Sequence, residues 1–100
     1  MEIPVNMLIL YTEFIKRLPQ VEIVVYTTKT HREIKRAIRK IYETRYDTTV
    51  FCHSKGIFRG KRVKKLTVLK RIRSLKQLEE ILRILKNELE PLWLEWGFNP

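Results

Sequence analysis

Few residues of this chain have side chains suited to covalent or acid–base chemistry. Cys52 and His53 are adjacent, and because adjacent side chains of a strand point to opposite faces, the two cannot act directly on one another. The chain has 1 cysteine, which excludes an internal disulfide and a cysteine-rich zinc site, so we expect Cys52 to be a small core residue. His31 stands at the start of a predicted helix, where backbone N–H groups favour an anion, although a solvated position is the more ordinary interpretation.

Positive charge is concentrated in one part of the sequence. The chain holds 21 Lys and Arg against 11 Asp and Glu, for a net charge of +10. Most of the excess lies in residues 29–76, the basic centre, whereas the segments on either side are slightly acidic. A high density of like charge destabilises a compact state unless an anion relieves it. Thermophilic enrichment would raise both signs together, so the segregation favours a binding surface over a merely solvated one.

Metal and nucleotide chemistry lack the residues that they need. The only acids of the basic centre are Glu33, Glu43 and Asp47, too few and too scattered to hold magnesium. The chain has 3 glycines and no glycine-rich phosphate motif, which makes nucleotide hydrolysis improbable. We therefore expect a protein that is not an enzyme, with no catalytic residue, metal, cofactor or small-molecule substrate. A metal-independent nuclease remains a third alternative without positive support.

Two segments of the basic centre have residues that could contact phosphates. One is a predicted helix that begins at a capping box formed by Thr30 and Glu33 and presents basic residues opposite its apolar stripe. The other is the tip of a predicted hairpin, where Phe58 either stacks on a base or is buried. The candidate residues are Arg32, Lys35, Arg36, Arg39, Lys55, Phe58, Arg59, Lys61, Arg62, Lys64 and Lys65. They predict a small nucleic-acid-binding protein, with duplex DNA favoured over RNA.

The elements that must position these residues form one predicted domain, residues 1–100. The pattern is αβαββα, a small α+β two-layer sandwich whose mixed or antiparallel sheet of about three strands is packed by helices. The first helix could instead begin as a strand. In chain order, the elements are expected over residues 7–18, 21–28, 30–46, 48–53, 63–72 and 75–90, with Gly56 and Gly60 in the loop of the hairpin.

The last predicted helix has leucines at alternating spacings of three and four residues. Ser74 and Gln77 form a second possible capping box before it. The stripe either covers the sheet or forms the seam of a homodimer. The residues of such an interface would be Leu78, Leu82, Leu85, Leu89, Leu92, Trp93 and Trp96. The alternative function is therefore a module for protein–protein interaction or oligomerisation through this C-terminal surface.

Hydropathy and composition predict where in the cell the protein is located and what kind of organism it comes from. No uncharged apolar run is long enough for a membrane span, and the N-terminus begins with Met1 and Glu2 instead of a basic leader. We expect a soluble, cytoplasmic protein with no membrane partner, in the host cytoplasm if the source is a virus. Few Asn, Gln, Cys and Met beside many Ile, Leu, Val, Lys, Arg and Glu are typical of a hyperthermophilic source, such as an archaeon or one of its viruses.

Overall fold

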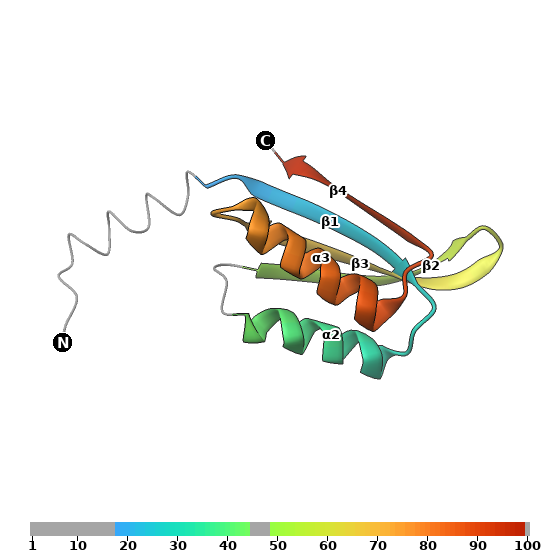
Figure 1. Cartoon of the computed structure of the whole chain (residues 1–100). Helices are drawn as coiled ribbons and strands as arrows, with labels where there is room; N and C mark the ends of the chain where they lie inside the picture. The colour runs from blue at the N-terminus through green and yellow to red at the C-terminus, as the bar shows by residue number, and fades with distance from the viewer. Residues whose placement is uncertain (1–17, 45–48, 100) are drawn as a thin grey trace.

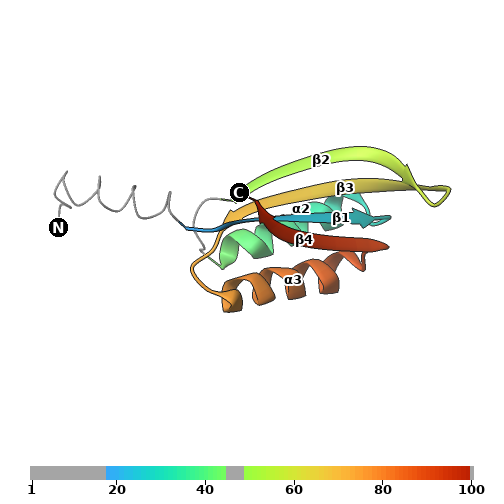
Figure 2. The same cartoon turned by 90° about the horizontal axis from the view of Figure 1, so that it is seen from above.

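Two helices and a four-stranded antiparallel sheet make up the part of the chain that the structure describes. The structure is a computed structural model, and it describes residues 18–44 and 49–99. The sheet has the strand order β2-β3-β1-β4, and both helices cover the same face of it (Figure 1, Figure 2). The elements are β1 (Gln20–Thr27), α2 (His31–Glu43), β2 (Thr49–Phe58), β3 (Lys61–Arg71), α3 (Leu75–Leu89) and β4 (Trp93–Asn99). The predicted α+β class with helices packed on a sheet is confirmed.

The core lies between the sheet and the helices. Successive side chains of a strand alternate between faces, and Val21, Ile23 and Val25 of β1 are all fully buried on the helix side. The helices supply stripes of apolar side chains at helical spacing. Those of α2 are Ile34, Ala37 and Ile41, and those of α3 are Leu78, Ile81, Leu85 and Leu89. The expected leucine stripe therefore covers the sheet of its own chain.

The two predicted capping boxes have different outcomes. At α2, the Thr30 hydroxyl accepts a hydrogen bond from the Glu33 N–H at 3.3 Å, and the Glu33 carboxylate accepts one from the Thr30 N–H at 2.8 Å. The second prediction is wrong, since the Ser74 side chain makes no capping hydrogen bond to α3. Gln77 instead accepts from the Arg73 N–H at 2.8 Å. The Gln77 side chain therefore bonds to Arg73, the residue before the N-cap, and the Ser74 side chain does not cap the helix.

The hairpin is longer and its turn is tighter than the sequence indicates. β2 continues to Phe58 and β3 begins at Lys61, so the turn is Arg59 and Gly60, with φ values of 50° and 79°. Two central residues with positive φ match the twist of paired strands, as in a type I′ turn. The prediction of a longer loop is wrong. Clustered charges and glycines are typical of loops, but here Gly56 lies inside β2, opposite Val63.

The C-terminal aromatic tail forms a strand that the predicted order αβαββα omits. β4 pairs antiparallel with β1 along its whole length, from Tyr26 opposite Trp93 to Gln20 opposite Asn99. The described elements therefore have the order βαββαβ, and the sheet has four strands instead of about three. α3 ends close to the predicted position. Glu90, directly after the helix, lies in the left-handed region with φ 41°, and Pro91 follows it.

Some sequence predictions fall on residues that the structure does not describe. Residues 7–17 of the element expected over residues 7–18 lie outside the described ranges, and so does Asp47. The side chain of Cys52 is not described either, so its expected core position stays a prediction. Within the described ranges, no helix is both long enough and apolar enough to span a membrane.

Candidate functional site

The predicted cationic residues come from α2 and from both faces of the hairpin. On α2, Arg32, Lys35, Arg36 and Arg39 are exposed, on the side of the helix opposite its buried stripe. In the hairpin, the alternation of strand side chains divides the cations between the two faces of the sheet. Lys65 lies opposite Tyr26 on the open face, defined here as the face that α2 and α3 do not cover. Lys61 shares that face, whereas Lys55, Arg62 and Lys64 share the other.

Phe58 packs within an aromatic cluster of its own chain. Its ring centroid lies 4.9 Å from that of Tyr26 and 6.1 Å from that of Trp93. The Arg59 guanidinium lies 5.1 Å from the centroid of the same ring, which is a cation–π contact. These contacts tie the hairpin tip to the centre and the edge of the sheet. The alternative of a buried Phe58 therefore describes the residue better than a ring that is free to stack on a base.

The predicted oligomer interface divides into a buried part and an exposed part. Leu78, Leu85 and Leu89 are at most 2% exposed in the single chain, so they are core residues, as the alternative of a stripe that covers the sheet predicts. Leu82 is half-buried against the core. The exposed members are Leu92 at 39%, Trp93 at 41% and Trp96 at 44%.

Phe98 is an exposed aromatic residue of β4 that the sequence-based set lacks. It is 57% exposed, and its ring meets that of Trp96 edge to face at a centroid distance of 5.9 Å. Trp96 lies opposite Ile23 and Phe98 opposite Val21, so both rings are on the helix side of the sheet. The alternation W-x-F was the available signal for a common face, but it has this meaning only once the tail is known to be a strand.

β4 combines these aromatic rings with an open sheet edge. β1 pairs with one side of β4, and no strand of the described ranges pairs with its other side. An edge strand presents backbone N–H and C=O groups that another strand can pair with. Exposed aromatic side chains beside such an edge are typical of an association surface. We call β4 together with Leu92 the C-terminal surface.

The structure brings two histidines together that are far apart in sequence. The rings of His31 and His53 stack at a centroid distance of 5.3 Å. Partial burial lowers the pKa of His53 below its ordinary value, and the positive charges of His31, Lys64 and Lys55 lower it further. Both effects disfavour the protonated, cationic form of the imidazole. Among the residues described, no group of three or more His, Cys, Asp and Glu could hold a metal ion.

Comparison with known proteins identifies the fold. No family model matches the chain, and no curated protein matches it either. The chain is similar to the crystal structure of CutA1 from Oryza sativa, with 18% identity, a TM-score of 0.51, and coverage of 83% of this chain and 80% of that one. CutA from Synechococcus elongatus has 12% identity, a TM-score of 0.44, and coverage of 80% and 75%. The de novo designed protein Ferredog-Diesel has 15% identity, a TM-score of 0.41, and coverage of 78% and 83%.

These findings correct the main functional prediction. The fold is similar to that of CutA1 from Oryza sativa, and this likeness contradicts the prediction of a DNA-binding or RNA-binding protein. The register also shows that the hairpin does not present its cations on one face, because Lys61 and Lys65 lie on the opposite face of the sheet from Lys55, Arg62 and Lys64. The alternative, an interaction module that uses the C-terminal surface, fits the findings better.

Proposed function

We propose that this protein is a non-enzymatic, self-associating interaction module, and that the C-terminal surface binds a second copy of the chain. The observation that carries the proposal is the edge strand β4, with Trp96 and Phe98 exposed beside it. A second copy of the chain supplies an edge strand that β4 can pair with, because β2 at the opposite end of the sheet is also an edge. Main-chain pairing of two edges would satisfy both rows of backbone groups.

Charge favours the pairing of unlike edges. β4 contains Glu95 and no basic residue, whereas β2 contains Lys55 and no acidic residue. Contact between β4 of one copy and β2 of the next brings opposite charges together, while a contact between two β4 strands brings together two Glu95 carboxylates. A contact between different surfaces of identical chains is heterologous, so it leads to a closed ring if the rotation between copies closes. We therefore propose a small ring in place of the predicted two-fold dimer.

Mass measurement of matched variants tests the proposal. Trp96→Glu with Phe98→Glu places charge on the C-terminal surface, and Leu75→Glu makes the same kind of change at a residue that is 61% exposed at the start of α3. We expect light scattering to give an oligomeric mass for the wild type and for Leu75→Glu, and a monomeric mass for the double variant. Circular dichroism checks that each variant retains its helices and strands.

Two results would reject the proposal. One is a monomeric wild type at every concentration that light scattering can reach. The other is an unchanged oligomeric mass for the double variant. If the glutamates unfold the chain, the milder pair Trp96→Ser and Phe98→Ser removes the same rings without burying charge, and its mass decides the question in the same way.

A further inference from the structure

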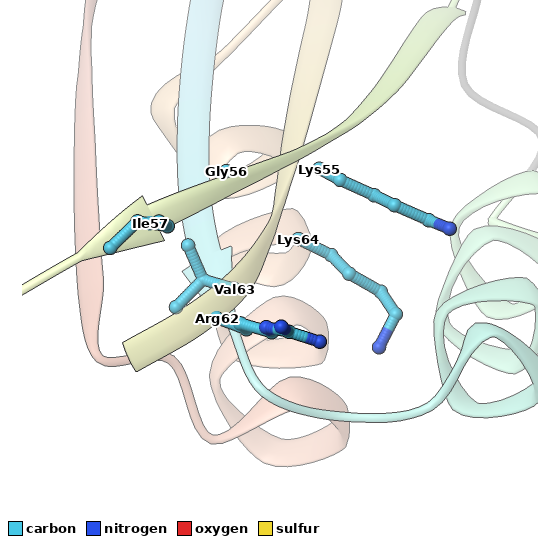
Figure 3. A pocket seen from close by; sticks show the side chains of 6 residues that line it. All are labelled: Lys55, Gly56, Ile57, Arg62, Val63 and Lys64. Atoms are coloured by element: carbon cyan, nitrogen blue, oxygen red, sulfur yellow. The ribbon is translucent and has the colours of Figure 1, made fainter. Parts of the chain in front are cut away.

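An open pocket lies on the hairpin, away from the C-terminal surface. Its volume is about 570 Å³, which is within the range of small-molecule sites. The lining residues are Lys55, Gly56, Ile57, Arg62, Val63 and Lys64 (Figure 3). Half of them are cations and none is acidic. We call this the hairpin pocket.

The register of the hairpin explains why three cations meet there. Lys55 lies opposite Lys64, and Ile57 lies opposite Arg62. Side chains of directly opposed residues lie on the same face of a sheet, and Figure 3 shows Lys55, Arg62 and Lys64 extending to the same side of the hairpin. Like charges that oppose each other across a strand pair are destabilising. The arrangement therefore costs stability unless an anion binds between the ammonium and guanidinium groups.

Lys64 is held in place by the main chain. Its Nζ donates a hydrogen bond to the backbone oxygen of Lys29 at 2.8 Å, and an ammonium group has three donors, so two remain for a ligand. The Glu90 carboxylate pairs with the Lys29 ammonium at 3.0 Å. Within the described ranges, neither Lys55 nor Arg62 makes an ion pair.

We propose that the hairpin pocket binds a small polyanion of the polyphosphate class. Lys55, Arg62 and Lys64 contact its phosphoryl oxygens, and Arg62 can do so through two parallel N–H donors. Ile57, which is 78% exposed beside them, offers an apolar contact to any organic part of the ligand. Inorganic polyphosphate and nucleoside triphosphates share this chemistry. The site contains no residue of the C-terminal surface, but Lys55 also lies on the β2 edge to which β4 of another copy is proposed to bind, so light scattering accompanies each binding measurement.

The pKa of His53 reflects the positive potential around Lys55 and Lys64. The charges of Lys64 and Lys55 help to lower the pKa of His53, after the larger effect of its partial burial. A group whose protonated form is disfavoured by two lysines lies in a field that favours anions. A bound polyanion would offset that field, so its binding is accompanied by a rise in the pKa of His53, which NMR titration of the imidazole measures.

Calorimetry with matched variants tests the pocket. The probes are inorganic tripolyphosphate, adenosine triphosphate and sulfate at equal ionic strength, with no magnesium added. Lys55→Gln with Arg62→Gln removes two charges that line the pocket, and Lys61→Gln with Lys65→Gln removes two charges from the opposite face of the same hairpin. We expect the first pair to weaken binding of tripolyphosphate by about tenfold or more and the second pair by less than about threefold.

The outcomes separate a pocket from general attraction to a cationic protein. Equal weakening by the two double variants, or binding of tripolyphosphate no tighter than that of sulfate, would overturn the proposal. Tighter binding of the nucleotide than of tripolyphosphate supports it and assigns the organic part to Ile57, whereas equal binding supports an inorganic ligand. All variants keep Lys64, whose contact with Lys29 belongs to the fold, and circular dichroism separates a loss of binding from unfolding.

Discussion

Both described helices begin after a residue with a hydroxyl group, but the two hydroxyls have different surroundings. Thr30 accepts from the Glu33 N–H, whereas Ser74 makes no such bond. An N-cap side chain stabilises a helix by satisfying a backbone donor that the helix leaves unpaired. The residue type alone therefore does not determine what each hydroxyl contributes to stability.

The pair of caps allows a matched substitution. Thr30→Ala should lower the free energy of unfolding by about 1 kcal/mol, because it leaves a helix N–H without its acceptor. Ser74→Ala removes a hydroxyl from the same kind of position and should change the free energy by less than about 0.5 kcal/mol. Urea unfolding followed by circular dichroism measures both. Equal losses would show that the Ser74 hydroxyl caps α3 in solution.

Glu33 makes the α2 cap dependent on pH. Its hydrogen bond from the Thr30 backbone is the main cause that holds the pKa of this carboxyl below its ordinary value of 4.5. A lowered pKa in the folded state means that the ionised carboxylate stabilises the fold at neutral pH, and that this contribution is lost as pH falls below 4.5 and through the folded pKa. The stability advantage of the wild type over Glu33→Gln should therefore shrink in acid. An advantage that stays constant from pH 7 into acid would contradict this assignment.

At the scale of elements, the hairpin depends far more on Gly60, in its turn, than on Gly56, inside β2. Gly60 has a φ of 79°, where a side chain is strained. Gly56 lies in β2 with nothing within 4 Å of an added Cβ. The two glycines lie four residues apart in one hairpin, but only Gly60 has a backbone conformation in which a side chain is strained.

Alanine substitution should separate the two glycines. Gly60→Ala should destabilise the protein by about 1 kcal/mol, because an L-residue pays a steric penalty in the left-handed region. Gly56→Ala adds the same methyl group to an extended segment with free space, and should stabilise it by about 0.5 kcal/mol through the unfolded chain. Thermal unfolding measures both changes. A destabilising Gly56→Ala would contradict the free space around this position.

Elements defined by local patterns could be predicted, and those defined by distant pairing could not. The capping box at Thr30, the helical stripe of α2 and the apolar run of β1 are all encoded within a few consecutive residues. β4 is recognisable as a strand only through its register with β1, which lies about seventy residues earlier in the chain. For the same reason, the sequence placed Lys61 and Arg62 on one cationic surface, although their strand directs them to opposite faces.

At the scale of the whole molecule, the segregated charge is distributed over two different surfaces. The cationic hairpin lies at the β2 end of the sheet, and the aromatic, acidic strand β4 lies at the other end. The proposed polyanion site uses cations on the helix side of the hairpin, and the proposed association joins the β4 edge to a β2 edge. Excess positive charge within one chain repels itself. Contact with the acidic edge of another copy and binding of an anion both reduce that repulsion.

Association through β4 should be visible in thermal stability. If the folded chain is oligomeric and the unfolded chain is not, mass action raises the melting temperature with protein concentration. A tenfold increase in concentration corresponds to about 1.4 kcal/mol, which should raise the melting temperature by about 3 °C or more. The Trp96→Glu, Phe98→Glu variant should melt at a temperature that does not depend on concentration, whereas Leu75→Glu should behave as the wild type does. A melting temperature of the wild type that does not change with concentration would contradict association through β4.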